Sequence, residues 1–217
     1  MPRPTPSPTD PGARPAREVR ADFDDTTIVV YQAYPPAVAG PALAAGTFVA
    51  PFRRGRMTWV KPSFLWMMYR CGWATKPDQE RVLAVRITRA GFEEALGEAA
   101  LSHVDPRVHA DTDAWREQTR VSPVRVQWDP ERSLTLDPLP WRSLQLGLSG
   151  TAVDRYVDAW VTDLTDVTGL ARDVRAAVLD GDRDAALAAL PVERPYPLPE
   201  PVAAQIGASP PVTSTTS

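Results

Sequence analysis

The sequence predicts an α+β fold, a single compact domain with a clustered, mostly antiparallel β-sheet core. Strand-like runs gather in blocks instead of alternating strictly with helices, which is the pattern of α+β proteins. The tryptophan-rich stretch at residues 56–73 predicts a helix that is apolar on most sides and therefore buried. Periodic apolar patterns after residue 149 add amphipathic helices on the C-terminal side.

The length and composition predict one domain with tails. The chain has 217 residues, of which 43% are hydrophobic, and this is enough for a sizeable core. Residues 1–18 hold six prolines, and residues 199–217 end in ASPPVTSTTS. Neither composition buries enough apolar surface to offset the entropy of ordering. We therefore expect disordered tails at 1–18 and 199–217 and one globular domain at 19–198.

The first part of the domain predicts a strand followed by a short helix. Residues 27–34 are rich in β-branched and aromatic side chains, which favour strands. Pro35 and Pro36 end the run, because proline cannot donate to a β-ladder. A short helix is expected over 36–45 and ends before Gly46.

The central stretch predicts a second strand and the buried helix. Residues 57–60 have the composition of a strand, and Pro62 then interrupts it. A helix is expected over 64–71, because proline is favoured at a helix start and Gly72 is a natural residue just past a helix end.

The segment that follows predicts a strand, a helix and a loop. Residues 81–88 alternate as a half-buried strand does, and Thr88 can cap a helix that carries apolar residues as far as Ala99. Residues 101–115 are expected to form an irregular loop that leads into a brief helix around Trp115.

The last part of the domain predicts a β-rich block and then helices. Strands are expected at 124–128, 133–136 and 142–148, separated by turns that contain proline. A helix capped by Ser149 is expected to continue through Leu164. Two shorter helices follow, at about 168–180 and 182–190.

Several classes of protein are excluded or disfavoured by composition. One cysteine cannot form an internal disulfide, and with two histidines the chain offers no Cys/His zinc cluster, so we expect no metal. No run approaches the roughly 18 apolar residues that span a bilayer, and residues 1–17 lack the apolar core that a secretory signal is expected to have. We therefore expect a soluble, cytoplasmic protein without a membrane partner. A pI of about 5.5 disfavours general nucleic-acid coating but leaves room for a local basic groove.

A local excess of basic residues surrounds the start of the predicted central helix. Residues 53–81 contain seven lysines and arginines against two acids. Lys61 lies next to the helix start at Ser63, and Arg56 lies just upstream. Because a helix N-terminus presents unpaired N–H groups, we expect an anion there, most plausibly a phosphate. The alternatives are a solvated charged surface and a helix that serves only as core.

Other reactive side chains have structural interpretations beside functional ones. Cys71 lies within the apolar helix and is expected to be an inert thiol. His103, in a loop, is a candidate ligand-binding residue or general base. Glu131 is either a turn residue that pairs with Arg132 or a catalytic carboxylate.

Long motifs of the chain resemble one family. DDTTIVVYQAYPP, RMTWVKPSFLWMMYRCGWATKPDQERVLAVRI, LSHVDPRVH, SPVRVQWDPER, LPWRSLQLGLSGTAVDRYVDAW and LPVERPYPL together resemble the family called Domain of Unknown Function 4291, over about residues 19–198. The order of elements is also similar to the layout of the ADP-ribosyltransferase-like fold, in which residues on three strands grip NAD.

That second resemblance implies a set of site residues. Its catalytic positions correspond to Gln32, Ser63 and either Glu131 or Gln145. Phosphate binding would come from Arg56 and Lys61, and base stacking from Tyr31, Trp59 or Trp66. His103 and Arg142 complete the set of expected ligand-binding residues.

Two classes of function are therefore expected. The first is an NAD-dependent ADP-ribosyl transferase or glycohydrolase that acts on a nucleotide, a nucleic acid or a small molecule. The second is a non-catalytic module that binds a nucleotide or an RNA end in the same basic cleft. Gln32 and Gln145 depart from the residue types usual in the transferase fold, which favours the second class. A scaffold without any small ligand is the third possibility.

Overall fold

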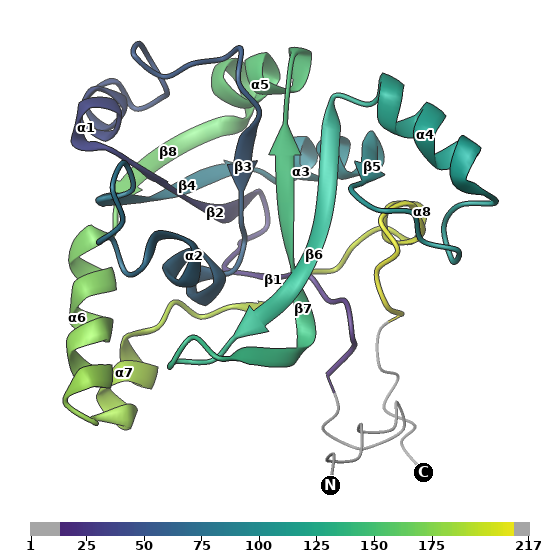
Figure 1. The fold of residues 1–217 in the computed structure, drawn as a ribbon. Helices are drawn as coiled ribbons and strands as arrows, with labels where there is room; N and C mark the ends of the chain where they lie inside the picture. Colours follow the sequence, from purple (N-terminus) through teal and green to yellow (C-terminus); the bar gives the residue numbers. More distant parts are fainter. Residues whose placement is uncertain (1–13, 211–217) are drawn as a thin grey trace, which may run out of the picture.

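Two β-sheets cross near the middle of the molecule (Figure 1). A computed structural model describes residues 14–210 of the chain. The three-stranded sheet has the order β2 (Thr27–Tyr34), β4 (Arg81–Thr88), β8 (Val161–Asp166), and all its neighbours are antiparallel. The four-stranded sheet has the order β3 (Thr58–Val60), β7 (Pro138–Leu148), β6 (Val124–Arg132), β5 (Ala99–Leu101), with only β5 and β6 parallel. The fold is therefore α+β and mostly antiparallel, as predicted.

The backbone joins the two sheets at one point. The Tyr31 amide donates to the Lys61 carbonyl at 2.7 Å, and the Lys61 amide donates to the Tyr31 carbonyl at 3.3 Å. Residues that follow Tyr31 on β2 and residues that precede Lys61 on β3 are thereby held next to each other.

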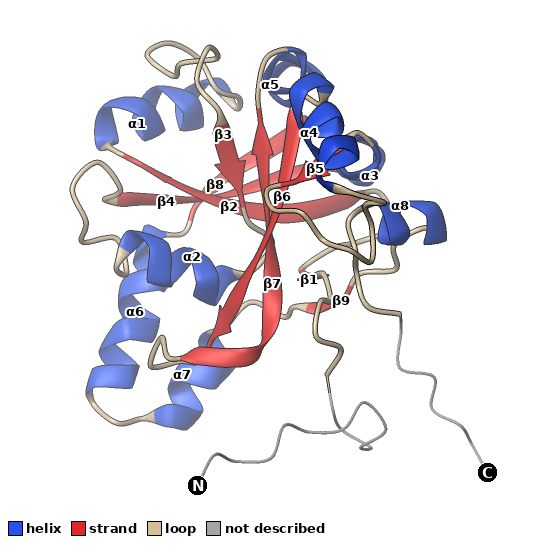
Figure 2. Ribbon diagram, turned by 45° about the vertical axis from the view of Figure 1, so that its right-hand side comes forward, coloured by secondary structure: helices blue, strands red, loops and turns tan. Residues whose placement is uncertain are grey.

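Helices cover the outer faces of the sheets (Figure 2). Their bounds are α1 Pro36–Ala45, α2 Phe64–Cys71, α3 Arg89–Gly97, α4 Thr112–Val121, α5 Thr151–Arg155, α6 Thr168–Leu179, α7 Arg183–Ala189 and α8 Glu200–Gln205. A π-helical turn, η1 (Tyr156–Trp160), extends α5. None of the helices in residues 14–210 combines the length and the apolar character that a membrane crossing needs.

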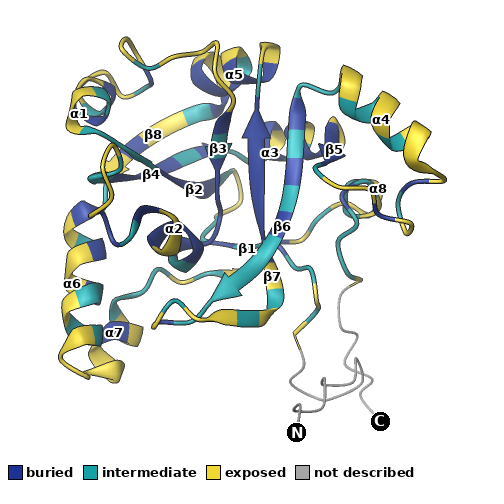
Figure 3. Cartoon of the chain, in the orientation of Figure 1, coloured by how far each residue is buried: buried dark blue, intermediate teal, exposed yellow. Residues whose placement is uncertain are grey.

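Strand β2 has both faces buried and separates two hydrophobic clusters. Ile28 and Val30 belong to the larger cluster between the sheets, whereas Val29 and Tyr31 face a second cluster that includes most of α2. Figure 3 shows this burial where the strands cross, with exposed surface on the outer helices.

Helix α2 ends before Gly72 as the sequence suggests, but it starts with a cap by Ser63, and Pro62 precedes this cap instead of occupying the first helical position. The Ser63 hydroxyl accepts from the Trp66 amide at 3.1 Å, and Gly72 adopts a left-handed conformation at the C-terminal end. Its side chains are buried except for Leu65, Tyr69 and Arg70, so it is a core helix with one accessible strip.

Several predicted elements are confirmed, and three are corrected. The strand at 27–34, the helices at 36–45 and 64–71 and the strand at 81–88 have the expected bounds. The helix expected through Leu164 ends at Trp160, because residues 161–166 pair with β4 as strand β8. Ala99 begins β5 instead of continuing α3, and residues 133–136 form the turn between β6 and β7.

The fold uses residues on both sides of the expected 19–198 boundaries. Arg17 and Ser209 hydrogen-bond to each other through two contacts, and the Trp128 indole donates to the Ile206 carbonyl at 2.8 Å. Strand β1 (Arg20–Ala21) pairs with β9 (Arg194–Pro195) and so joins the N-terminal and C-terminal parts of the domain. The expected tails are therefore part of the domain at 14–18 and 199–210, while their remaining residues lie outside the described range.

Candidate functional site

A cleft of about 850 Å³ opens where the two sheets meet. It is lined by the end of β2, the loop at 51–57, helix α2, the turn at 77–79 and the facing surface of β3, β6 and β7. Of the expected site residues, it brings together Gln32, Arg56, Trp59, Lys61, Trp66 and Gln145.

The floor of the cleft is the polar face of the four-stranded sheet. Because side chains alternate along a strand, Gln127 and Asp129 on β6 share a face with Gln145 on β7, while their neighbours on the strands, Val126, Trp128, Leu144 and Leu146, point into the core. The Asp129 carboxylate accepts from Gln127 Nε2 at 2.9 Å and from Gln145 Nε2 at 2.6 Å. Because the Nε2 atoms of Gln127 and Gln145 bind Asp129, their Oε1 atoms point away from it and are available to accept hydrogen bonds.

Gln32 lies at one side of the cleft in a fully formed network. Its Nε2 lies 2.8 Å from the Tyr34 hydroxyl and 3.2 Å from the Thr58 hydroxyl, and its Oε1 accepts from the Tyr156 hydroxyl at 2.6 Å. Since these protein partners use both ends of the amide, Gln32 positions Tyr34 and Thr58, which also line the cleft.

Lys61 is buried at the back of the cleft and has no acidic partner within residues 14–210. Its side chain donates to the Trp59 carbonyl at 3.2 Å, and Nζ lies 5.3 Å from the centre of the Trp66 ring. Burial lowers the pKa of Lys61 to about 7, and the positive charge of Arg70 acts in the same direction against a smaller opposite effect of Asp129.

Three arginines face the same cleft. Arg53 and Arg56 come from the loop, and Arg70 comes from the accessible strip of α2. Within residues 14–210 none of the three forms an ion pair, and Asp78 is the one acidic residue among the described lining residues. Arg54 is excluded from this group because it pairs with Asp154 and Asp158 on the neighbouring helix. The cleft therefore carries an excess of positive charge.

Two indole rings complete the cleft, and one glycine makes room for the ring of Trp59. Trp59 lies against Gly147, where an added Cβ would approach the ring to 3.0 Å. Trp66 is only 7% exposed, and its Nε1 donor has no hydrogen-bond partner among the described residues. A buried donor without a partner is costly, so a ligand atom at this place would be favoured.

Sequence comparison now defines the family. The family model described as "Domain of unknown function (DUF4291)" matches residues 18–196 of the chain. The chain belongs to this family. No curated protein and no solved structure matches it.

In this family member, the start of α2 is not the anion site that the sequence suggests. The Phe64 amide donates to Glu193 Oε1 at 2.6 Å, and the Trp66 amide donates to the Ser63 hydroxyl. Ser63 in turn donates to Glu131 Oε1 at 2.9 Å. The expectation is corrected because the chain supplies its own acceptors, and Ser63 and Glu131 do not line the cleft.

The two carboxyl groups at this helix start are held in an unusual environment. Burial raises the pKa of Glu193 to about 8, and the nearby Glu131 raises it further while the Phe64 amide opposes the shift. Burial likewise raises the pKa of Glu131. Glu193 has no local sequence signal, because its partner lies 129 positions away in the chain.

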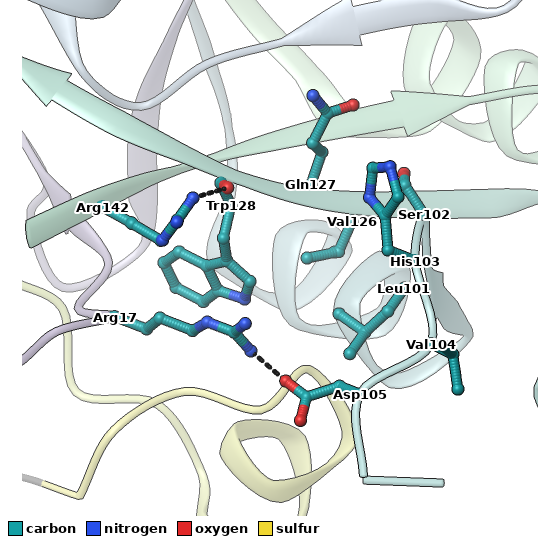
Figure 4. A pocket seen from close by; sticks show the side chains of 10 residues that line it. All are labelled: Arg17, Leu101, Ser102, His103, Val104, Asp105, Val126, Gln127, Trp128 and Arg142. Carbon is teal, nitrogen blue, oxygen red and sulfur yellow. Dashed lines mark hydrogen bonds and ion pairs between the residues drawn. The ribbon is translucent and has the colours of Figure 1, made fainter. Parts of the chain in front are cut away.

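The remaining expected site residues lie elsewhere. Tyr31 is buried and packs edge-on against Phe64. Arg142 and His103 line a separate cavity of about 210 Å³, where Arg142 donates to the Trp128 carbonyl at 2.9 Å (Figure 4). In the same view Gln127 points away from the Trp128 ring, toward the side of β6 that faces the cleft.

Proposed function

We propose that the cleft between the two sheets binds a phosphorylated nucleotide, with NAD as the first candidate. The observation that carries this proposal is the meeting of cations, indole rings and fixed amide oxygens in one cavity. Phosphate, base and sugar hydroxyls are the three parts of a nucleotide that need these three kinds of group.

The phosphates are assigned to the arginines of the loop. Arg53 and Arg56 are free of ion pairs within the described residues, and a guanidinium matches two phosphate oxygens at once. Arg70 adds positive potential from the other wall of the cleft, and Lys61 does so when it is protonated.

The base and the sugar are assigned to the remaining lining groups. Trp59 and Trp66 offer aromatic surface for stacking, and the free Trp66 donor suits an acceptor nitrogen or oxygen. Since Asp129 fixes the amide groups of Gln127 and Gln145, their oxygens suit sugar hydroxyls or the carboxamide N–H of nicotinamide.

Cleavage of NAD, by an ADP-ribosyl transferase or a glycohydrolase, is the second candidate function. Breaking the bond to nicotinamide develops positive charge on the ribose, and a nearby carboxylate stabilises it. Asp129 does not itself line the cleft, but it is the favoured carboxylate because it is hydrogen-bonded to Gln127 and Gln145, which do, whereas Glu131 is engaged with Ser63. The acceptor would be a nucleotide, a nucleic acid or a small molecule. We also propose a cytoplasmic location, since Cys71 is a free buried thiol.

Calorimetric titration tests the binding proposal. We expect NAD, ADP-ribose and AMP to bind and adenosine to bind more weakly. Arg56→Ala should weaken the binding of the phosphorylated ligands by about 1–3 kcal/mol, the value of a charge-assisted hydrogen bond. Arg54→Ala is the matched control, because Arg54 comes from the same loop but pairs with Asp158. Equal losses in both variants would refute the assignment.

Release of nicotinamide separates the enzyme from the binding module. If the protein cleaves NAD, Asp129→Asn should abolish release while Glu131→Gln leaves it in place. Binding of NAD or of an RNA 5′ end without release supports the non-catalytic module.

A further inference from the structure

Lys61 differs from almost every other basic residue of the chain. Of 24 basic residues only Lys61 and Lys76 are lysines, and the remainder are arginines. Lysine can lose its proton and then attack a carbonyl carbon, whereas arginine stays charged in proteins. Lys61 is 4% exposed and lines the cleft, while Lys76 lies on the surface. The one buried cation of the cleft is therefore also a residue that can become a neutral nucleophile.

The surroundings of Lys61 favour its neutral form. Its hydrogen-bond partner is a backbone carbonyl, and no carboxylate lies within ion-pair distance among the described residues. A buried ammonium ion without a carboxylate is costly, so the proton is lost at a lower pH than on the surface. The charged groups that face it are Arg70 on α2 and Asp129 on β6, and the thiol of Cys71 lies nearby with its pKa raised by burial.

We propose that Lys61 captures a phosphorylated aldehyde as an imine in the cleft. The Nζ lone pair attacks the aldehyde carbon to give a carbinolamine, which loses its hydroxyl and a nitrogen proton as one water molecule. The products are the imine and water, and no oxidant or reductant is needed.

The chemistry of the lining groups specifies the aldehyde further. The arginines select a phosphate, and the fixed oxygens of Gln127 and Gln145 select hydroxyl groups. A sugar phosphate in its open-chain form carries all three parts, and so does the free ribose end that remains when NAD loses nicotinamide. The choice of a phosphorylated substrate rests on the proposed function, but the covalent bond rests on Lys61 alone.

Reductive labelling of the full-length wild-type protein tests the inference. The protein is incubated with pyridoxal 5′-phosphate and cyanoborohydride near neutral pH, and the labelled lysines are identified by mass spectrometry. We expect Lys61 to be labelled at least about tenfold faster than Lys76, the exposed lysine in the same molecule. Labelling of Lys76 alone, or of both lysines at the same rate, would overturn the proposal.

Two further arms separate the covalent step from phosphate binding. Pyridoxal without its phosphate should label Lys61 much more slowly; equal labelling would keep the reactive amine but remove the phosphate site. The labelling rate of Lys61 should level off above pH 7 to 8, where its buried amine has lost its proton. If pyridoxal 5′-phosphate binds in the cleft but leaves Lys61 unlabelled, the covalent inference fails and the binding proposal stands.

Discussion

Glu193 accepts the hydrogen bond of the Phe64 backbone amide, with 2.6 Å between Oε1 and the nitrogen. The start of α2 is thus closed by the chain itself, and the excess positive charge of the surrounding residues acts in the adjacent cleft. The residues that stabilise the start of α2 are therefore different from those that line the cleft, so stability and ligand binding can be tested with different variants.

Replacement of Glu193 should change the pH dependence of stability. The pKa of its carboxyl rises from 4.5 in the unfolded chain to about 8 in the folded protein. The folded state therefore binds the extra proton, and this contribution is fully present below pH 4.5 and lost as the pH rises through about 8. Glu193→Gln stays neutral and keeps an acceptor oxygen, so its melting temperature should gain on the wild type as the pH rises. Thermal unfolding across this window measures the gain.

Exposed Glu117 provides the control for this prediction. Glu117→Gln should show no comparable gain, because Glu117 lies on the surface of α4 and its pKa is lowered by Arg120. If the melting curves of wild type and Glu193→Gln stay parallel at all pH values, the buried carboxyl does not titrate as described.

Removal of the Ser63 hydroxyl should lower stability and spare binding. Ser63→Ala loses the cap of the Trp66 amide, which is worth about 1 kcal/mol, and leaves Glu131 with the Arg132 amide as its donor. Urea unfolding measures the loss, and calorimetry should show unchanged affinity for NAD. If the folded variant loses much of its affinity for NAD, the result would support an anion site at the start of α2 and contradict its assignment to the cleft.

An added methyl group at Gly147 should disturb the floor of the cleft. Its Cβ would lie 2.9 Å from Met57 Sδ and 3.0 Å from the Trp59 ring, so both must move. We expect Gly147→Ala to shift tryptophan fluorescence and to weaken nucleotide binding several-fold. Gly55→Ala is the control because nothing lies within 4 Å of its added Cβ. Unchanged fluorescence and affinity would show that Trp59 does not shape the site.

Because α3 lies close to η1, replacement of Gly91 by alanine should lower the stability of the protein. A Cβ at Gly91 would overlap the Trp160 ring, whereas one at Gly97 in the same helix meets nothing within 4 Å. Overpacking of this kind costs about 1–3 kcal/mol. Chemical denaturation should therefore show a clear loss for Gly91→Ala and almost none for Gly97→Ala. Similar stability of the two variants would contradict the packing.

Local sequence patterns predict the elements whose causes are local. Helix α2 follows from Ser63 at its start and Gly72 at its end, and β2 follows from its composition between turn residues. Strand β8 could not be predicted in this way, because Val161 and Leu164 also fit a helical period. They form a strand because they pair with Ile87 and Val85 on β4, which are distant in sequence.

The same distinction applies to the candidate site. Lys61, Arg56 and Trp59 could be selected from a dense local stretch, and the cleft contains all three. The roles of Asp129 and Glu193 could not, because each depends on a contact with a residue far along the chain. Ser63 and Glu131 illustrate the converse, since residue types that suit catalysis instead hold a helix start.

The central claim is that the cleft between the two sheets binds a phosphorylated nucleotide. Its most direct test is a structure determined from crystals of the protein soaked with ADP-ribose. The account predicts a diphosphate beside Arg56, a ring stacked on Trp59 or Trp66, and ribose hydroxyls at the oxygens of Gln127 or Gln145. An empty cleft at a ligand concentration that saturates binding in solution, or ligand beside Arg142 instead, would contradict it.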